Sequence, residues 1–160
     1  MTYPMVDELR RQQPRRPRRV SQKAIVIEAL RNTPLFSRAT ERDLQTVAKH
    51  AQVRVVPAGK TIMREGEKGD RFFVVVDGTV RVTRNGRKVT DLRSGRGFGE
   101  LALLSNAPRT ATVTTVDDTE LVSIDRKTFS KVLDESPAFA RRMLEATAAR
   151  LREHDAKSVQ

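Results

Sequence analysis

The chain has few of the side chains that metal ions, redox chemistry and hydrolytic catalysis require. Its 160 residues include no cysteine and no tryptophan, one tyrosine and two histidines. The absence of cysteine excludes a disulfide framework and a thiolate metal site. His50 and His154 lie far apart in the sequence, and no serine–histidine–aspartate or paired-carboxylate arrangement stands out. We therefore expect no metal site, no cofactor and no enzymatic activity.

Long apolar runs are missing as well. No stretch reaches the roughly 18 apolar residues of a membrane span, and no apolar stretch of signal-peptide length follows Met1. We expect a cytoplasmic protein without a transmembrane segment. A length of 160 residues predicts one domain with at most an appendage, and 38% apolar residues suffice for one modest core.

Acidic residues are the minority among the charged residues. The chain has 20 aspartates and glutamates against 31 lysines and arginines, a net charge of +11. Such an excess favours an anionic partner: a phosphate ligand, nucleic acid, a membrane surface or an acidic protein. Residues 1–23 hold seven basic residues against two acidic ones. Because residues 1–20 also contain three prolines and few apolar groups, we expect them to form a disordered tail.

The residue pattern of the remaining chain changes twice. Residues 21–52 have helical spacing, residues 53–124 have short alternating stretches between glycine and aspartate turns, and residues 125–160 are again helical. Many short strands joined by such turns predict a barrel or jelly roll. Within this segment, Asn85-Gly86 is a strong signal for a type I′ hairpin turn, because both residues tolerate positive φ.

Four residues mark the starts of predicted helices. Ser21, Thr40 and Asp125 can each accept a hydrogen bond from a free backbone N–H of the first helical turn. Pro137 suits the first position of a final helix, because an N–H there would have no partner within the helix. The sequence therefore predicts helices at both ends of the β-rich segment.

The most informative string runs from Gly97 to Val113. It combines a glycine-flanked turn, one acid, a short apolar helix at 101–104 and one arginine nine residues after the acid. The glycines let the backbone approach a ligand closely, and the free N–H groups of the helix form a natural phosphate cradle. Arg109 can donate a forked pair of hydrogen bonds to phosphate oxygens, and Glu100 can accept one from a sugar hydroxyl. The alternative is that Arg109 and Glu100 simply pair with each other on the surface.

The same string resembles the phosphate-binding cassette of the cyclic nucleotide-binding domain family. The resemblance lies in Phe98–Leu103 and Pro108–Val113. Two further segments resemble the family: the glycine-flanked aromatic strand at Gly66–Gly78 and the helix entry at Asp125–Phe129. Over about residues 30–154 the chain looks like the module found in protein kinase regulatory subunits and in the bacterial catabolite activator family. We expect it to be a stand-alone single domain.

The resemblance implies a fold and a ligand. The fold would be a mainly β, eight-stranded antiparallel jelly-roll barrel with N-terminal helices and two C-terminal helices. The ligand would be cyclic AMP, which we slightly prefer, or cyclic GMP. The expected contacts divide by the part of the nucleotide: for the phosphate Arg109 and the backbone at Leu101, Ala102 and Ala111, for the ribose Glu100 and Gly99, and for the base Thr110.

The aromatic residue that usually stacks on the base in this family is missing. The chain has no tryptophan, and its only tyrosine is Tyr3. The last helix supplies the candidate caps, through cation–π or apolar contact: Arg141, Arg142, Met143 and Leu144. The same helix carries a short heptad-like stripe: Ala140, Leu144, Thr147 and Leu151. The stripe is consistent with a helix packed on the barrel, a lid or a dimer seam.

Together these patterns predict a non-enzymatic regulator. A cyclic nucleotide bound at 97–113 would shift the C-terminal helices and signal to a separate effector protein, with a homodimer through the last helix as an open alternative. A second hypothesis is a scaffold whose basic tail binds nucleic acid, an acidic membrane or an acidic partner. A third is a kinase-inhibitor role for Arg18-Arg19-Val20-Ser21, which resembles the substrate consensus of cyclic-AMP-dependent kinases.

Overall fold

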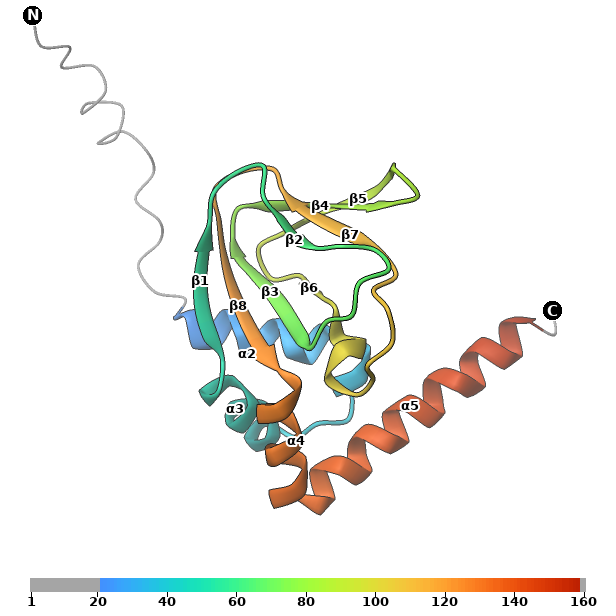
Figure 1. Ribbon diagram of the computed structural model, residues 1–160. Coiled ribbons are helices and arrows are strands. Elements are labelled where there is room, and N and C mark those ends of the chain that lie inside the picture. Colours follow the sequence, from blue (N-terminus) through green and yellow to red (C-terminus); the bar gives the residue numbers. More distant parts are fainter. Residues whose placement is uncertain (1–20, 159–160) are drawn as a thin grey trace, which may run out of the picture.

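Two four-stranded antiparallel sheets form the centre of the molecule (Figure 1). The computed structural model describes residues 21–158, with side chains to residue 155, so the predicted tail at 1–20 lies outside the described residues. One sheet has the strand order β1-β8-β3-β6 and the other β2-β7-β4-β5. The strands are β1 Gln52–Val56, β2 Thr61–Met63, β3 Arg71–Asp77, β4 Thr79–Arg84, β5 Arg87–Arg93, β6 Gly97–Phe98, β7 Thr112–Thr115 and β8 Thr119–Asp125. Eight antiparallel strands with helices before and after them confirm the predicted fold class.

Side chains of β3 alternate between two cores. Phe72, Val74 and Val76 belong to the cluster that the helices cover, whereas Phe73 and Val75 lie between the two sheets. Successive side chains of a strand point to opposite faces, so a strand packed on both faces is apolar throughout. These two cores explain why Phe72–Val76 is an uninterrupted run of aromatic and β-branched residues.

The hairpin between β4 and β5 has the predicted turn. Asn85 has a φ of 52° and Gly86 a φ of 74°, and a type I′ turn needs positive φ at both central residues. Asn85 is the only non-glycine residue with positive φ in the described part of the chain. The hairpin turn predicted from Asn85-Gly86 is therefore confirmed.

The helices begin at the predicted caps. The side chain of Ser21 accepts from the N–H of Ala24, Thr40 forms a capping box with Asp43, and Asp125 accepts from the N–H of Thr128 at 2.7 Å. Each bond satisfies an N–H that has no partner inside its helix. The helices are α2 Gln22–Asn32, the 3₁₀ helix η1 Pro34–Phe36, α3 Glu41–Lys49, α4 Arg126–Glu135 and α5 Pro137–Ser158.

Phe36 of η1 joins the helices to the first sheet. Its ring centroid lies 6.4 Å from that of Phe72 on β3, 5.8 Å from that of Phe129 on α4 and 6.3 Å from that of Phe139 on α5. Aromatic rings at such separations contribute to stability beyond the area they bury. The N-terminal helices, the sheet and the C-terminal helices thus share one aromatic cluster.

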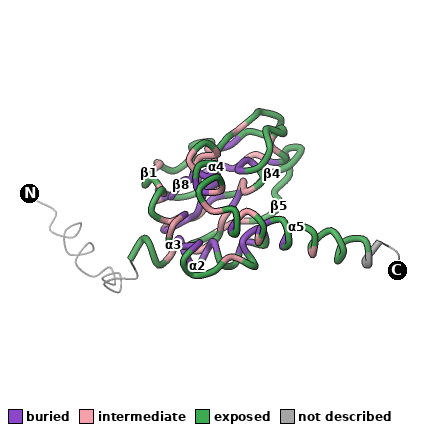
Figure 2. Tube along the Cα trace, turned by 90° about the horizontal axis from the view of Figure 1, so that it is seen from below, coloured by how far each residue is buried: buried purple, intermediate pink, exposed green. Residues whose placement is uncertain are grey.

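The long helix α5 is buried only near its start (Figure 2). Phe139, Met143 and Ala146 are buried, whereas Leu151 on a later turn is 62% exposed. From its start the helix runs past η2 (Glu100–Leu103), a 3₁₀ helix in the string at 97–113, and away from the sheets (Figure 1). Although α5 has 22 residues, neither it nor another described helix combines the length and apolarity that a membrane span requires.

Candidate functional site

The turn before η2 depends on Gly99. This residue has a φ of +80°, in the left-handed region where side chains with a Cβ are strained. A Cβ at Gly99 would also lie 2.8 Å from Nη1 of Arg109. The helix that follows is a 3₁₀ turn over Glu100–Leu103, one residue earlier than the predicted 101–104, with the N–H of Ala102 donating to the carbonyl of Gly99 at 3.2 Å. Glycine therefore lets the turn and the arginine approach each other.

Arg109 donates to two backbone carbonyls. Its Nη2 lies 2.9 Å from the oxygen of Arg71 and its Nη1 lies 3.4 Å from that of Gly99. It forms no ion pair with Glu100, so the alternative of a simple surface pair between these two residues is wrong. A guanidinium has five N–H donors, which leaves donors for an anion. Burial lowers the pKa of Arg109, and the charge of Asp70 opposes that shift in part.

The loop between β2 and β3 fixes the backbone of Arg109 through two hydrogen bonds. The N–H of Gly66 donates to the carbonyl of Arg109, and the N–H of Arg109 donates to the carbonyl of Glu67, both at 2.8 Å. A Cβ at Gly69 would lie only 2.3–2.5 Å from the guanidinium atoms of Arg109, so a larger residue there would displace the guanidinium from this position. The glycine-rich string at 66–70 is thus explained by its contacts with the arginine.

One cavity of about 140 Å³ collects most of the predicted site residues. Gly99, Glu100, Leu101, Ala102, Arg109 and Thr110 line it, together with Met63, Ser105, Ala107 and Pro108. We call it the cassette cavity. Ala111 does not line it, since its side chain is buried at 4% exposure next to Thr110. Arg109, Glu100 and residues at the start of η2 therefore line one small space.

Arg84 binds the backbone of Thr110 near the end of the cassette. The sequence did not identify Arg84 as a site residue. Its Nε donates to the carbonyl of Thr110 at 3.0 Å, from the end of β4. The neighbouring N–H of Asn85 donates to the carboxylate of Glu65 at 3.3 Å. The Asn-Gly turn was the available signal, because it predicts the hairpin tip, but the sequence does not say which loop the tip contacts.

The predicted caps do not face the cassette cavity. Arg142 binds Asp43 on α3 through two hydrogen bonds, Nε to Oδ2 at 2.8 Å and Nη2 to Oδ1 at 2.9 Å. Met143 is buried at 4% exposure in the helical core, while Leu144 is 71% exposed and Arg141 is exposed. In this arrangement the first turns of α5 pack in the core and bind α3.

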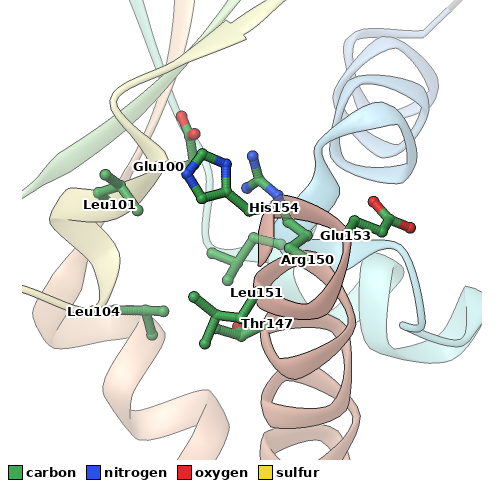
Figure 3. Close-up of a pocket in the computed structure, with 9 residues that line it drawn as sticks. Glu100, Leu101, Leu104, Thr147, Arg150, Leu151, Glu153 and His154 are labelled. Atoms are coloured by element: carbon green, nitrogen blue, oxygen red, sulfur yellow. The ribbon is translucent and has the colours of Figure 1, made fainter. Parts of the chain in front are cut away.

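A later stretch of α5 faces the cassette instead (Figure 3). A cavity of about 390 Å³ separates the two, and we call it the helix cavity. Its cassette side consists of Glu100, Leu101 and Leu104, with Leu35 of η1 beside them. The α5 side consists of Thr147, Arg150, Leu151, Glu153 and His154. Glu100 therefore borders both the cassette cavity and the helix cavity.

Metal binding has no support in the described side chains. Among residues 21–155, no group of three or more histidine, cysteine, aspartate or glutamate residues is placed to hold a metal ion. The site chemistry available there is hydrogen bonding and charge.

Known proteins share both the sequence pattern and the fold. The profile of the cyclic nucleotide-binding domain family matches residues 53–136. A cAMP-dependent protein kinase regulatory subunit from Blastocladiella emersonii is 39% identical over 135 residues, which are 81% of this chain and 34% of that protein. The chain thus spans about a third of the length of this relative.

Solved structures resemble the same region. The N-terminal domain of a transcriptional regulator from Streptomyces coelicolor A3(2) superimposes with a TM-score of 0.72 at 28% identity, covering 81% of this chain and 94% of that one. The regulatory domain of Toxoplasma gondii PKA in complex with cAMP gives a TM-score of 0.62 at 37% identity, covering 69% of this chain and 44% of that one. With its cassette geometry and a family profile over most of its strands, the chain belongs to the cyclic nucleotide-binding domain family.

Proposed function

We propose that the chain is a non-enzymatic receptor for a cyclic nucleotide. The observation that carries the proposal is the cassette cavity, where Arg109 and Glu100 line one space without pairing with each other. A cyclic nucleotide offers an anionic phosphate and a ribose hydroxyl, which match a cationic donor and a carboxylate acceptor. The family match and the cAMP-bound relative support the same ligand class.

Each cassette residue has a proposed contact. Arg109 binds the phosphate, with the backbone at Leu101, Ala102 and Ala111 completing the cage. Glu100 accepts from the ribose hydroxyl beside Gly99, and Thr110 reaches the base. Thr110 is exposed and lines the cassette cavity, so its hydroxyl is accessible to a bound base. Cyclic AMP is the preferred ligand, since the related structure holds it, and cyclic GMP is the alternative.

The signal passes from the cassette to α5. Glu100 borders both cavities, so engaging it with a ribose changes the surface that faces Thr147, Arg150 and Leu151. A shift of α5 requires that the nucleotide bind the two positions of the helix with different affinity. These later residues are better placed than 141–144 to cover a bound base.

The output reaches a separate effector in the cytoplasm. The similarity to kinase regulatory subunits favours a kinase-like partner. The exposed Leu144 and Leu151 of the heptad-like stripe favour a homodimer through α5 as the second arrangement. The inhibitor hypothesis concerns Arg18-Arg19-Val20-Ser21, of which only Ser21 lies within the described residues.

Isothermal titration with cyclic AMP and then cyclic GMP tests the receptor. Arg109→Ala should lower the affinity at least tenfold, because hydrogen bonds to charged groups contribute about 1.5–3 kcal/mol. Arg93→Ala, an exposed arginine on β5 outside the cassette cavity, is the matched control and should bind as the parent does. The ratio of the two affinities identifies the signal. No saturable binding of either nucleotide to the parent chain would refute the proposal.

A further inference from the structure

A third cavity, of about 280 Å³, borders Arg109 on the side of the β2–β3 loop. It shares Arg109 and Met63 with the cassette cavity. Its other walls come from β1, β2 and the start of β3. Five basic side chains line it: Arg54, Arg64, Lys68, Arg71 and Arg109. We call it the basic cavity.

The positive charge in the basic cavity is not balanced. Glu67 and Asp70 are its only acidic lining residues, against the five basic ones. By contrast, the cassette cavity has one arginine and one glutamate, and the helix cavity has one arginine and two glutamates. Arg54, Arg64 and Lys68 are exposed, and like charges gathered on one surface repel each other. Neither the cassette cavity nor the helix cavity has a positive excess of this size.

Most of these cations have no counter-charge in the described chain. The side chains of Arg54, Arg64 and Lys68 form no hydrogen bond or ion pair with a described residue. Arg71 lies 3.9 Å from the carboxylate of Asp70 and otherwise donates to neutral oxygens, those of Ser123 at 3.3 Å and of Gln52 at 3.4 Å. The basic cavity therefore has many hydrogen-bond donors and few acceptors.

Arg109 points to the same shortage. Burial lowers the pKa of Arg109, and the charge of Asp70 opposes that shift only in part.

We propose that the basic cavity is a second anion site, which binds a free small anion carrying at least two linked phosphates. Guanidinium groups bind phosphate oxygens through paired, charge-assisted hydrogen bonds, and several of them around one space match several oxygens. A second phosphate is favoured over a single one because the cavity offers donors from four segments of chain: β1, the β2–β3 loop, β3 and the cassette. Arg109 connects this site to the cassette cavity, since its guanidinium borders both.

Occupancy of the two sites is antagonistic. Two anions on either side of one guanidinium repel each other and compete for its remaining donors. An anion in the basic cavity therefore weakens nucleotide binding in the cassette cavity. The reverse effect has the same size, because coupling between two binding sites is reciprocal.

The direct test is titration of pyrophosphate into the full chain without nucleotide, compared with sulfate at equal ionic strength. Saturable binding of pyrophosphate, at least tenfold tighter than sulfate, is expected. The double variant Arg54→Gln, Arg64→Gln should weaken pyrophosphate binding at least tenfold, and Lys68→Gln should weaken it several-fold. The control Arg93→Gln, Lys131→Gln removes two exposed charges outside the three cavities and should change it less than twofold. Equal weakening in both double variants, or equal binding of sulfate, would mean general charge attraction and overturn the site.

A second titration tests the coupling. Saturating pyrophosphate should lower the affinity for the cyclic nucleotide several-fold in the parent chain and leave it unchanged in the Arg54→Gln, Arg64→Gln variant. An unchanged nucleotide affinity in the parent would overturn the antagonism. Because pyrophosphate binding is measured without nucleotide, failure of the receptor proposal would leave the direct test intact.

Discussion

The two halves of α5 differ in what holds them. From Pro137 to Ala146 the helix is anchored by Phe139 and Met143 in the core and by Arg142 on Asp43 of α3. From Thr147 onward no residue with a described side chain is buried, and the helix faces the cassette across the helix cavity. A helix anchored at one end only can change its position at the other end without unfolding the core. We therefore expect ligand-dependent change in the second half and constancy in the first.

The largest expected effect is on the free energy of unfolding, and it should differ between substitutions in the two halves of α5. Phe139→Ala should lower the free energy of unfolding by about 3–5 kcal/mol, because it empties a fully buried ring position that contacts Phe36 and Phe129. Leu151→Ala should change it by less than about 0.5 kcal/mol, since that side chain is 62% exposed. Chemical denaturation of both variants measures the contrast. Similar losses in the two variants would show that the second half is anchored as well.

A smaller effect concerns the link between α3 and α5. Asp43→Asn should destabilise the fold by about 2 kcal/mol, because Asp43 accepts two hydrogen bonds from Arg142 and belongs to the capping box of α3. Burial would raise the pKa of Asp43, but the hydrogen bonds from Arg142 and Thr40 outweigh it and the pKa is lowered. A matched control is Asp134→Asn, an exposed aspartate of α4 with no described ion pair.

The lowered pKa sets the direction of the pH dependence. A carboxylate with a depressed folded-state pKa stabilises the protein above its unfolded-state value of about 3.9, and this contribution is lost as pH falls through the folded-state value. The difference in melting temperature between the parent and Asp43→Asn should therefore be constant from pH 7 to 5 and shrink below about pH 4. A difference that grows on acidification would contradict the assignment.

The smallest effect is on ligand affinity and tests the free half of α5. Leu151→Asp should change the affinity for the cyclic nucleotide about threefold to tenfold, or roughly 0.7–1.4 kcal/mol, because it places a charge in the helix cavity opposite Leu101 and Leu104. Leu144→Asp is the matched control: the residue is exposed on the same helix but outside that cavity. Calorimetry and size-exclusion chromatography should be run on both variants. Equal affinity changes would favour an effect through a dimer seam.

Local patterns were sufficient for much of this architecture. The caps at Ser21, Thr40 and Asp125 and the Asn85-Gly86 turn depend on neighbours close in the sequence, and all were predicted. The cassette was predicted as a string for the same reason, since a turn, a helix start and a following arginine are adjacent along the chain.

Contacts between distant segments could not be predicted in this way. The sequence did not show that Arg109 donates to the carbonyls of Arg71 and Gly99, or that Arg84 braces Thr110 from the β4–β5 hairpin. It placed the cap at 141–144, whereas the structure brings the turns after Thr147 to the cassette. Helical spacing defines which residues share a face, but the angle at which a helix leaves its anchor depends on packing.

By itself, the sequence determined the order of the elements, their caps and turns, and the cassette with its arginine and glutamate. These are properties of short stretches, in which backbone preference and side-chain periodicity act between near neighbours. Only the tertiary structure decided which half of α5 is anchored, which cavity Glu100 shares with that helix, and that five cations from β1, the β2–β3 loop, β3 and the cassette meet in one space. Such features depend on how strands separated by many residues pair and pack, because side chains distant in the sequence meet only when the sheets and helices come together.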